Sequence, residues 1–539
     1  MQAVYSTSSL KQANPTPFKS LTGKLDPGIL KALDAMQYEY MTPVQEKVLN
    51  SLPSLRTDCL VQAKTGTGKT TAFLLPALQS LVTSDSVPKG QVAILILSPT
   101  RELAMQIAKE CNQITAHLHK RIECHTAFGG SARATALSSF MNGSPSVLVA
   151  TPGRLKDYLS EKPTQAKFKN LRTVILDEAD TMLEKGFLED VKHILRLLPP
   201  KRSGWQGMCF SATVPDKIKD VLEVVLMPNY ATVSTIDKFE PPTHTRVPQY
   251  HVVIPTVKDT FTALLSLVEH ERQEGEANPK IIVFGTTANL VALYAEFFRR
   301  SSSLRVYELQ SRLSQPQRTR TTREFKEATS GIMFATDVIG RGMDFPNVTS
   351  VIQVGLPMNG EQYVHRVGRT ARVDRDGRAV ILLTHAESFF LRSNQNLPIR
   401  PYVHEIDTKD NAAATEAMAT IDEKSKQKAY SAYLGFMKGF MNKLQLKPEA
   451  LVAMANELAI KALHCPGVPP MEKKTIGKMG LRGVQGINYG TLSDDESPSK
   501  RMKPNVEQRQ TFNSAPRGGR AARGRGAGGG GRGGMKNIA

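Results

Sequence analysis

The chain has little cysteine and no long run of apolar residues. Its five cysteines are scattered over 539 residues without a Cys-x-x-Cys pair: Cys59, Cys111, Cys124, Cys209 and Cys465. This usage argues against a disulfide framework and a cysteine-based zinc site, and it predicts reduced thiols. No apolar run approaches the roughly 18 residues that a membrane-spanning helix needs, so the sequence predicts no membrane partner.

The N-terminal segment lacks acidic residues. Asp26 is the first acid, and Lys11, Lys19 and Lys24 precede it amid Ser and Thr. Such a segment resembles an organelle presequence, although it lacks the Arg in which presequences are usually rich. We expect residues 1–19 to be a flexible N-terminus that could include a presequence. The expected location is the mitochondrial matrix, with the nucleus or nucleolus and the cytoplasm as alternatives.

Bases outnumber acids along the chain. There are 70 Lys and Arg against 50 Asp and Glu, which gives a net charge of +20. An excess of this size favours a polyanionic partner, although a basic mitochondrial or ribosome-associated protein would also show it. The length predicts two or three domains.

Short apolar runs alternate with helical patterns in two successive blocks. The first block has runs at 59–62, 92–97, 147–149, 174–176 and 208–210, and the second at 281–284, 306–309, 332–335, 351–354 and 380–383. Each run ends in a polar cluster. This alternation predicts βαβ units and parallel sheets, which bind ligands at the carboxyl ends of their strands. We therefore predict two α/β domains, at 20–235 and 250–400, with a linker at 236–249 and the active cleft between the domains.

Residues 401–490 show a helical pattern without strand-like runs. Within this extension, residues 424–446 alternate basic residues with Tyr430, Tyr433, Phe436 and Phe440. One interpretation is a helical cap packed on the second domain, and the other is an RNA-binding surface. Both can hold, because one helix face can pack while the opposite face binds.

The final segment, residues 491–539, is poor in apolar residues. From Pro498 to the end there are ten Lys or Arg and one acid, Glu507, so this stretch supplies about +9 of the +20. It ends in Gly-Arg repeats. Such a composition predicts a disordered basic tail that contacts nucleic acid without reading its sequence. A solubilising tail is the alternative.

Residues 63–70, Ala-Lys-Thr-Gly-Thr-Gly-Lys-Thr, match the P-loop pattern with Ala63 in place of its first Gly. The glycines let backbone N–H groups turn toward phosphates, Lys69 is expected at the β- and γ-phosphates, and Thr70 is expected on Mg²⁺. The candidate nucleotide-binding loop comprises Ala63, Lys64, Thr65, Gly66, Thr67, Gly68, Lys69 and Thr70.

Three carboxylates, Asp177, Glu178 and Asp180, follow the apolar run at 174–176. Acids this close repel one another unless a cation or a catalytic role holds them. Together with the phosphate loop, they predict that Asp177 holds Mg²⁺ and that Glu178 polarises water. The alternative is an acidic strand-to-helix loop in which Asp180 caps the helix.

Together these clusters resemble the DEAD-box RNA helicases over about residues 18–400, with some ten motifs in the family's order. Residues 177–180 read Asp-Glu-Ala-Asp, the motif that names the family. Residues 37–45 resemble its adenine-reading motif, which implies that Tyr38 stacks on the base and Gln45 hydrogen-bonds its edge. Gln37 and Met41 stand where the family usually has Gly and Pro. The resemblance implies two tandem RecA-like domains, with ATP and Mg²⁺ as cofactors.

The resemblance continues into the second domain. Asp337 and residues 341–344, Arg-Gly-Met-Asp, match the motif that meets nucleotide and RNA, which implies nucleotide contacts from Gly342 and Asp344. Residues 365–372 match the arginine-finger motif, which implies that Arg369 and Arg372 reach the γ-phosphate, a role suited to a permanently charged fork of donors. A basic surface cluster is the alternative. The implied catalytic residues are Lys69, Asp177, Glu178, Arg369 and Arg372.

Further motifs imply coupling and RNA contacts. Residues 211–213 match the motif that links hydrolysis to strand separation, and the implied coupling set is Asp180, Ser211, Ala212, Thr213, His365 and Arg366. The implied RNA contacts are Pro99, Thr100, Arg101, Gly129, Gly130, Thr151, Pro152, Gly153, Arg154, Gln315, Arg318 and Thr336. Contacts of this kind to phosphates position a strand without reading its sequence. Gln310 departs from the family's usual His.

Within the family, residues 341–348, the Thr370-Ala371 pair, the helical extension and the basic tail are most similar to the fungal mitochondrial RNA chaperones that help group I and group II introns fold and splice. This resemblance implies an ATP-hydrolysing RNA helicase, acting as a monomer, that melts short duplexes of structured or intron RNA by domain closure. An ATP-gated RNA clamp in ribosome or ribonucleoprotein assembly is the alternative. The DEAD and glutamine motifs disfavour a DNA translocase.

Overall fold

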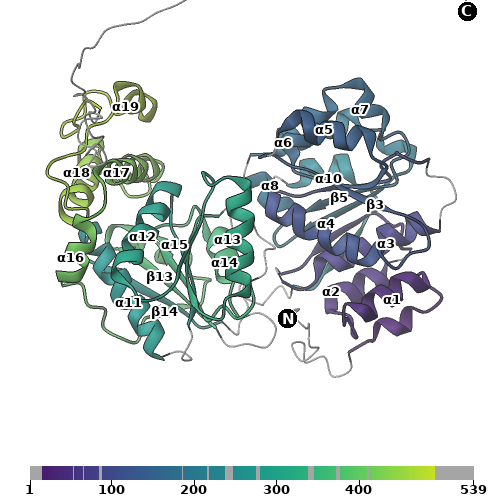
Figure 1. Ribbon diagram of the computed structural model, residues 1–539, viewed down its shortest axis with the longest axis horizontal. Coiled ribbons are helices and arrows are strands. Elements are labelled where there is room, and N and C mark those ends of the chain that lie inside the picture. The colour runs from purple at the N-terminus through teal and green to yellow at the C-terminus, as the bar shows by residue number, and fades with distance from the viewer. Residues whose placement is uncertain are drawn as a thin grey trace, which may run out of the picture. The chain divides into compact units, whose positions relative to one another are not determined.

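The computed structural model describes residues 15–491 except 53, 65, 84–87, 131, 185, 215–217, 237–246, 275–278, 338–344, 372–376 and 410–411 (Figure 1). Both predicted sheets are present, each has seven strands, and every strand pair in them is parallel. The predicted fold class, two tandem parallel-sheet domains followed by a helical region, is confirmed. Of the predicted flexible N-terminus at 1–19, residues 1–14 lie outside the described residues, whereas Phe18 and Lys19 already belong to a short helix in which Phe18 is buried. Most of the linker and the basic tail beyond residue 491 also lie outside the described residues.

The first sheet has the strand order β3-β4-β2-β5-β6-β1-β7. Its strands are β1 Cys59–Gln62, β2 Ile94–Leu97, β3 Glu123–Ala127, β4 Pro145–Ala150, β5 Thr173–Asp177, β6 Gln206–Ser211 and β7 Ala231–Ser234. Strand β6 lies between β1 and β5, with Phe210 in register with both Val61 and Asp177. The loops that follow β1, β5 and β6 therefore leave the sheet side by side at its carboxyl edge.

Helices cover both faces of the first sheet (Figure 1). One face carries η2 Phe18–Leu21, α1 Pro27–Ala35, α2 Pro43–Glu46, η3 Lys47–Ser51, α3 Lys69–Val82 and α4 Arg101–Thr115. The other carries α5 Arg133–Asn142, α6 Pro152–Leu159, α7 Lys162–Ala166, α8 Ala179–Glu184, α9 Leu188–Leu197 and α10 Lys219–Val225. Alternate residues of β2 enter the two cores, Ile94 and Ile96 on one face and Leu95 and Leu97 on the other, as the period of two in a strand requires.

The second sheet has the order β10-β11-β9-β12-β13-β8-β14. Its strands are β8 Gln249–Ile254, β9 Lys280–Phe284, β10 Val306–Leu309, β11 Gly331–Ala335, β12 Ser350–Val354, β13 Arg378–Thr384 and β14 Ile399–Pro401. Its longer helices are α11 Thr260–Glu274, α12 Ala288–Ser301, α13 Gln315–Glu327 and α14 Gly360–Val367, followed by the short α15 Phe389–Ser393.

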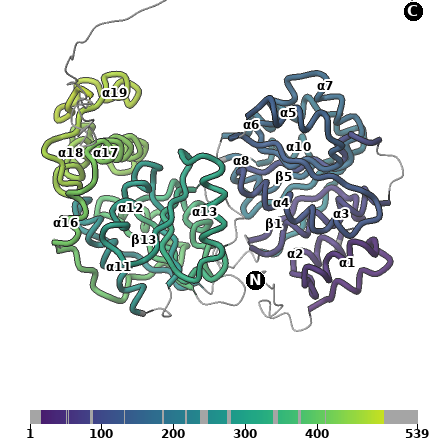
Figure 2. Tube along the Cα trace, in the orientation of Figure 1, coloured from purple at the N-terminus to yellow at the C-terminus, as the bar shows by residue number. Residues whose placement is uncertain are grey.

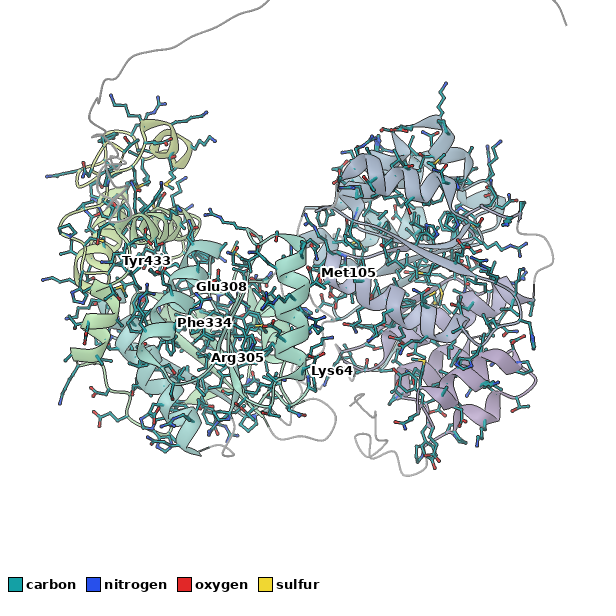
Figure 3. All side chains as sticks on the ribbon, viewed as in Figure 1. Lys64, Met105, Arg305, Glu308, Phe334 and Tyr433 are labelled. Carbon is teal, nitrogen blue, oxygen red and sulfur yellow. The ribbon has the colours of Figure 1, made fainter. Side chains whose placement is uncertain are left out.

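The helical extension comprises α16 Ala412–Ala419, α17 Glu423–Lys438, α18 Pro448–Glu457, η8 Leu458–Ala462 and α19 Lys473–Met479. Helix α17 packs on α12, and the chain can be followed from β13 through α16 to α19 in Figure 2. Tyr430 and Tyr433 (the latter labelled in Figure 3) are buried and share one continuous apolar core with the second sheet. These tyrosines therefore pack, as the cap interpretation predicted.

The basic residues of the extension lie mostly on its outer side. Lys424, Lys438 and Lys443 are at least partly exposed, whereas Lys426 is buried and paired with Glu423. RNA binding by this exposed face stays a prediction. Among the described residues, no helix is both long enough and apolar enough to cross a membrane.

Candidate functional site

The phosphate loop turns directly from β1 into α3. Gly66 and Gly68 adopt φ values of 77° and 83°, the left-handed region that favours glycine. Lys69 is the first residue of α3, it is buried, and its Nζ donates to the Ala63 carbonyl at 3.0 Å. Thr67 Oγ1 donates to the Lys64 carbonyl at 2.8 Å. These hydrogen bonds join residues within the loop and hold it at the N-terminus of α3. The free N–H groups of a helix N-terminus favour binding of a phosphate. Thr65 lies outside the described residues.

Gln45 connects the adenine motif to this loop. It belongs to the first turn of α2, where Thr42 N donates to Gln45 Oε1 at 2.8 Å in a capping box. The other amide atom, Nε2, donates to the Gly68 carbonyl at 3.2 Å. Glycine at position 68 is favoured by its φ of 83°, and a Cβ there would lie 2.5 Å from that Nε2 and displace the Gln45 amide. The side chain predicted to read adenine therefore already braces the phosphate loop.

Gln37 and Met41, which stand where the family usually has Gly and Pro, differ in how the fold accommodates them. Gln37 adopts φ 61°, the left-handed conformation that glycine would take at little cost and that costs other residues about 1–2 kcal/mol. Met41 is buried in the apolar core. Tyr38 is partly buried and packs against the same core, so the motif is packed in place without the usual Gly and Pro.

The acidic cluster lies at the carboxyl end of β5. Asp177 is the last residue of that strand, and both Asp177 and Glu178 are buried. Burial and the neighbouring Glu178 together raise the pKa of Asp177 to about 7, and Lys69 opposes the rise. Glu178 adopts a left-handed φ of 51°, a strained conformation that is common at functional sites. Mg²⁺ at nucleotide sites binds a few protein oxygens together with phosphates, and Thr70 and Asp177 can supply such oxygens.

Asp180 joins the acidic loop to the loop after β6. Its Oδ2 accepts hydrogen bonds from Ala212 N at 3.1 Å, Thr213 N at 2.9 Å and Thr213 Oγ1 at 3.2 Å. Asp180 N donates in turn to Ser211 Oγ at 3.3 Å, and Ser211 Oγ donates to the Thr213 carbonyl at 2.6 Å. The predicted coupling residues of the first domain are therefore bonded to one another, and a shift of the acidic loop must move residues 211–213.

In the second domain, Arg366 forms a two-pronged ion pair with Asp337. Nε and Nη2 of Arg366 each lie 2.8 Å from a carboxylate oxygen of Asp337, and the guanidinium sits over the Phe284 ring. The Arg366 side chain is 3% exposed and that of Asp337 is 38% exposed. His365, on the same helix, is buried.

Arg369 is buried rather than exposed to a ligand. It is 1% exposed, it follows the last turn of α14, and its Nε donates to the His365 carbonyl in that turn at 3.2 Å. Delivery of this guanidinium to a nucleotide would need a rearrangement of that helix end. Gly342, Asp344 and Arg372 lie outside the described residues, so their predicted roles stay predictions.

Arg101 organises one predicted RNA-contact region. Thr100 caps α4 by accepting from Leu103 N at 3.3 Å, and Pro99 precedes it. Cβ atoms at Gly129 and Gly130 would lie only 2.9 Å and 2.3 Å from the Arg101 guanidinium. The paired glycines therefore make room for the Arg101 guanidinium.

Sequence reasoning missed Glu102, the neighbour of Arg101. Its Oε1 pairs with Arg318 Nη2 at 2.6 Å and accepts from Gln315 Nε2 at 3.2 Å, while Arg101 Nη1 donates to Gln315 Oε1 at 3.3 Å. Glu102 of the first domain thus bonds to two predicted RNA contacts of the second domain, Arg318 and Gln315, and Gln315 in turn accepts from Arg101. The position of Glu102 directly after Arg101, a predicted RNA contact, was the feature of the sequence that could have identified it.

The remaining predicted contacts lie at strand and helix ends. Thr151 is the N-cap of α6, Pro152 is its first residue, and Gly153 is exposed, with open space where a Cβ would stand. Arg154 lies over the Tyr158 ring, and Thr336 directly follows β11.

Gln310, which replaces the family's usual His, holds the turn after β10. Its Oε1 accepts from Arg312 N at 2.6 Å, and its Nε2 donates to Glu308 Oε1 at 3.2 Å. The residue is buried, so its visible role is structural.

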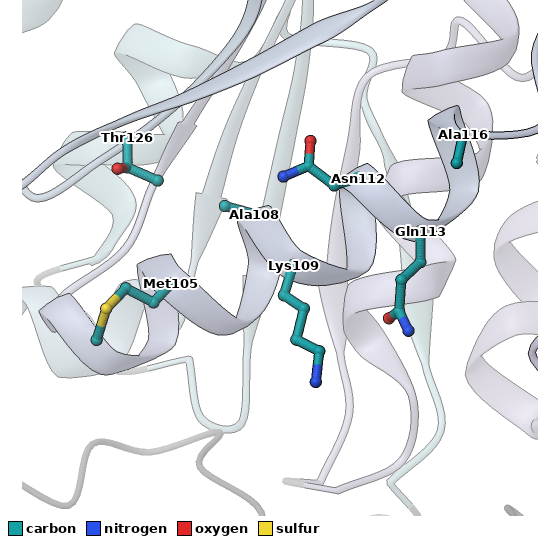
Figure 4. A pocket seen from close by; sticks show the side chains of 7 residues that line it. All are labelled: Met105, Ala108, Lys109, Asn112, Gln113, Ala116 and Thr126. Carbon is teal, nitrogen blue, oxygen red and sulfur yellow. The ribbon is translucent and has the colours of Figure 1, made fainter. Parts of the chain in front are cut away.

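A shallow pocket of about 510 Å³ lies elsewhere, along the outer side of α4 (Figure 4). Its lining residues are Met105, Ala108, Lys109, Asn112, Gln113, Ala116 and Thr126. None of the predicted catalytic residues that the structure describes lines it, so the candidate nucleotide site lies at the loops of the carboxyl edge of the first sheet and not at this hollow.

Comparison with known proteins agrees with the geometry. The model of the DEAD/DEAH box helicase family matches residues 42–221, and that of the helicase conserved C-terminal domain matches residues 259–374. These segments contain the phosphate loop, the acidic cluster and Arg369.

Relatives match over most of the chain. The mitochondrial ATP-dependent RNA helicase mss116 of Aspergillus oryzae is 59% identical over 508 residues, covering 92% of this chain and 80% of that protein. MSS116 of Phaeosphaeria nodorum is 55% identical, with 91% and 90% covered. A structure of Mss116p bound to single-stranded RNA and AMP-PNP is 27% identical, with a TM-score of 0.78 over 90% of this chain and 99% of that one. The predicted family is confirmed: the chain belongs to the DEAD/DEAH box helicases.

Proposed function

We propose that this protein is a mitochondrial ATP-dependent RNA helicase that remodels structured RNA, including intron RNA during splicing. The observation that carries the proposal is the junction at the carboxyl edge of the first sheet. There the phosphate loop, the acidic cluster and residues 211–213 leave neighbouring strands, and Asp180 bonds directly to Thr213.

Each residue at this junction has a distinct task. Bound ATP with Mg²⁺ supplies the phosphoanhydride bond and the neutralising cation. Lys69 neutralises phosphate charge, and Thr70 and Asp177 offer oxygens to the cation. Glu178 orients the attacking water and accepts its proton. Asp180 transmits the movement of the acidic loop to Thr213, which links hydrolysis to the grip on RNA.

Two substitutions test this assignment together. Lys69→Ala should abolish ATP hydrolysis, because it removes the cation that neutralises the phosphates. Glu178→Gln should still bind ATP and RNA but stall turnover. Hydrolysis by the Glu178→Gln variant at the parent rate would remove Glu178 from catalysis.

The alternative function, an RNA clamp, would use the same closed state but would retain RNA without unwinding duplexes. RNA-stimulated ATPase and unwinding of a short duplex should be measured on one preparation of the full chain. We expect both activities with comparable ATP dependence. Stimulated hydrolysis with stable RNA retention and no unwinding would favour the clamp.

The mitochondrial location is supported by the names of the relatives and by the predicted N-terminal segment, whereas the intron substrate rests on the resemblance of the motifs and the extension to the splicing chaperones. Import of the full chain into isolated mitochondria tests the location. We further propose that the protein acts as a monomer, which sedimentation with and without RNA tests directly.

The basic tail is proposed to tether the core to large RNA. Truncation at Ser497 removes ten basic residues and no predicted catalytic residue. ATPase activity on short single strands should survive, while affinity for a structured RNA should fall and its salt dependence should flatten, since fewer counterions are released. Equal salt slopes for the full-length and truncated proteins would assign the tail to solubility instead.

A further inference from the structure

Helix α4 reaches from the predicted RNA-contact region deep into the first domain. Its N-terminus carries Thr100 and Arg101, and its apolar face, including Leu103, Ile107 and Ile114, is buried against the first sheet. At 1.5 Å per residue, the helix rises about 14 Å between Arg101 and Glu110. The helix is thus one continuous element that spans from the predicted RNA contacts to Glu110.

Glu110, in the third turn of α4, contacts the helix that carries the phosphate loop. Its Oε1 accepts a hydrogen bond from Thr71 Oγ1 at 2.5 Å. Thr71 is buried and is the third residue of α3, directly after Lys69 and Thr70. A threonine inside a helix commonly bonds back to its own preceding turn, but this hydroxyl crosses to the neighbouring helix.

The environment of Glu110 makes this bond a strong constraint. Burial raises the pKa of the carboxyl to about 7, and the hydrogen bond from Thr71 opposes that rise. A hydrogen bond in surroundings poor in water is stronger than one at the surface, and loss of either partner leaves the other unsatisfied.

We propose that Glu110 is a positioning residue that couples RNA binding at the N-terminus of α4 to the phosphate loop. It does so by holding Thr71, and with it Lys69 and Thr70, in fixed relation to Arg101. This inference rests on the proposed function. It adds a path between the RNA and nucleotide sites that lies within the first domain, separate from the Asp180–Thr213 junction.

The test compares RNA-stimulated with basal ATPase rates in the full chain, using a short single-stranded RNA. Thr71→Val keeps the side-chain shape and removes the donor, and Glu110→Met removes the acceptor. Each should lower the ratio of stimulated to basal rate about tenfold and raise the RNA concentration needed for half-maximal stimulation. The double variant should be no worse than the poorer single variant, because both remove the same bond.

Conservative variants separate positioning from packing. Thr71→Ser keeps the hydroxyl and Glu110→Gln keeps the accepting oxygen, so both should restore the ratio to within about twofold of the parent. Thr83→Val, at the end of α3, is the matched control, because the Thr83 hydroxyl donates to Gln79 O within its own turn. That control should leave the ratio unchanged.

The outcomes distinguish this inference from the proposed function. If Lys69→Ala still hydrolyses ATP like the parent, the proposed function fails first. If Lys69→Ala is inactive while Thr71→Val and Glu110→Met keep the parent ratio, only the coupling role is overturned. Additive losses in the double variant, or no rescue by Glu110→Gln, would also overturn it. If Thr71→Val does not fold, the rate ratios of Glu110→Met and Glu110→Gln still compare a variant without the hydrogen bond with one that keeps it.

Discussion

The two helicase domains hold their candidate residues in opposite ways. In the first domain, Lys69, Gln45 and Asp180 are fixed by hydrogen bonds to the very loops that would meet a ligand. In the second, Arg366 is held by Asp337, and Arg369 is buried and bonded to the His365 carbonyl. The first domain therefore holds its predicted nucleotide residues in place by itself, whereas the predicted finger Arg369 would have to leave its buried position to reach a nucleotide. Catalysis should depend on that rearrangement more than binding does.

The largest expected effect comes from the buried arginine. Arg369→Ala should leave nucleotide binding within a few-fold of the parent, since the first domain supplies the phosphate loop. RNA-stimulated turnover should fall by about 10³–10⁵, the range for arginine fingers. Titration with a fluorescent nucleotide measures the binding, and a steady-state ATPase assay measures the turnover.

The matched control for Arg369 is Arg320→Ala, which removes an exposed arginine paired with Glu324 on α13. It should change turnover by less than about twofold. A loss below about tenfold for Arg369→Ala would move the finger to Arg372.

Breaking the ion pair of the second domain should cost stability. Asp337→Ala leaves the buried Arg366 guanidinium without its two-pronged partner, so we expect about 1–3 kcal/mol of destabilisation. Thermal melting of the full chain measures it. Asp157→Ala, which loses an exposed pair with Arg133, should cost less than about 1 kcal/mol. Equal melting temperatures for the two variants would show that the Asp337–Arg366 ion pair does not stabilise the fold more than an exposed pair does.

A smaller effect is expected at the adenine motif. Gln45→Ala should weaken the preference for ATP over GTP by about 0.5–1.5 kcal/mol, the value of one hydrogen bond. Because Gln45 also donates to Gly68, binding of both nucleotides should weaken as well. Competition binding reports both effects. Gln79→Ala, which removes an acceptor for Asp26 N outside the site, is the control. Unchanged discrimination with weaker binding would leave Gln45 only its bracing role.

The smallest expected effect is on pH dependence. The raised pKa of Glu110, about 7 against an ordinary value of 4.5, means that the folded chain keeps a proton that the unfolded chain has lost. This stabilising contribution is complete below pH 4.5 and is lost as pH rises through about 7, by about 1 kcal/mol after allowance for the half-buried position of the side chain. Glu110→Gln should flatten that slope in melting curves between about pH 4.5 and 7. An unchanged slope would place the titration elsewhere.

The strands show what the sequence could predict. All ten apolar runs became strands, because strands buried on both faces are nearly continuous in Val, Ile and Leu. The runs did not reveal β3, β7, β8 and β14. Three of these are edge strands, and β3 reads Glu-Cys-His-Thr-Ala with only Ala127 buried. Partly exposed strands carry polar residues that the apolar pattern does not detect.

The candidate site was predictable in composition but not in contacts. Motif spacing identified the phosphate loop and the acidic cluster because their chemistry needs particular residue types. It could not show that Gln45 already donates to Gly68, that Arg369 is buried, or that Glu102 and Glu110 bind residues far along the chain. These contacts depend on side-chain packing between elements that no local pattern encodes.

Tyr430, Tyr433 and Leu434 belong to the same apolar core as the strands of the second sheet. The second domain and the helical extension should therefore melt as one cooperative unit, giving a single calorimetric transition for residues 247–491. A chain that ends at residue 400 would leave apolar surface of α12 in water, where it favours aggregation. During synthesis, the second domain should thus stay dependent on chaperones until α17 has left the ribosome.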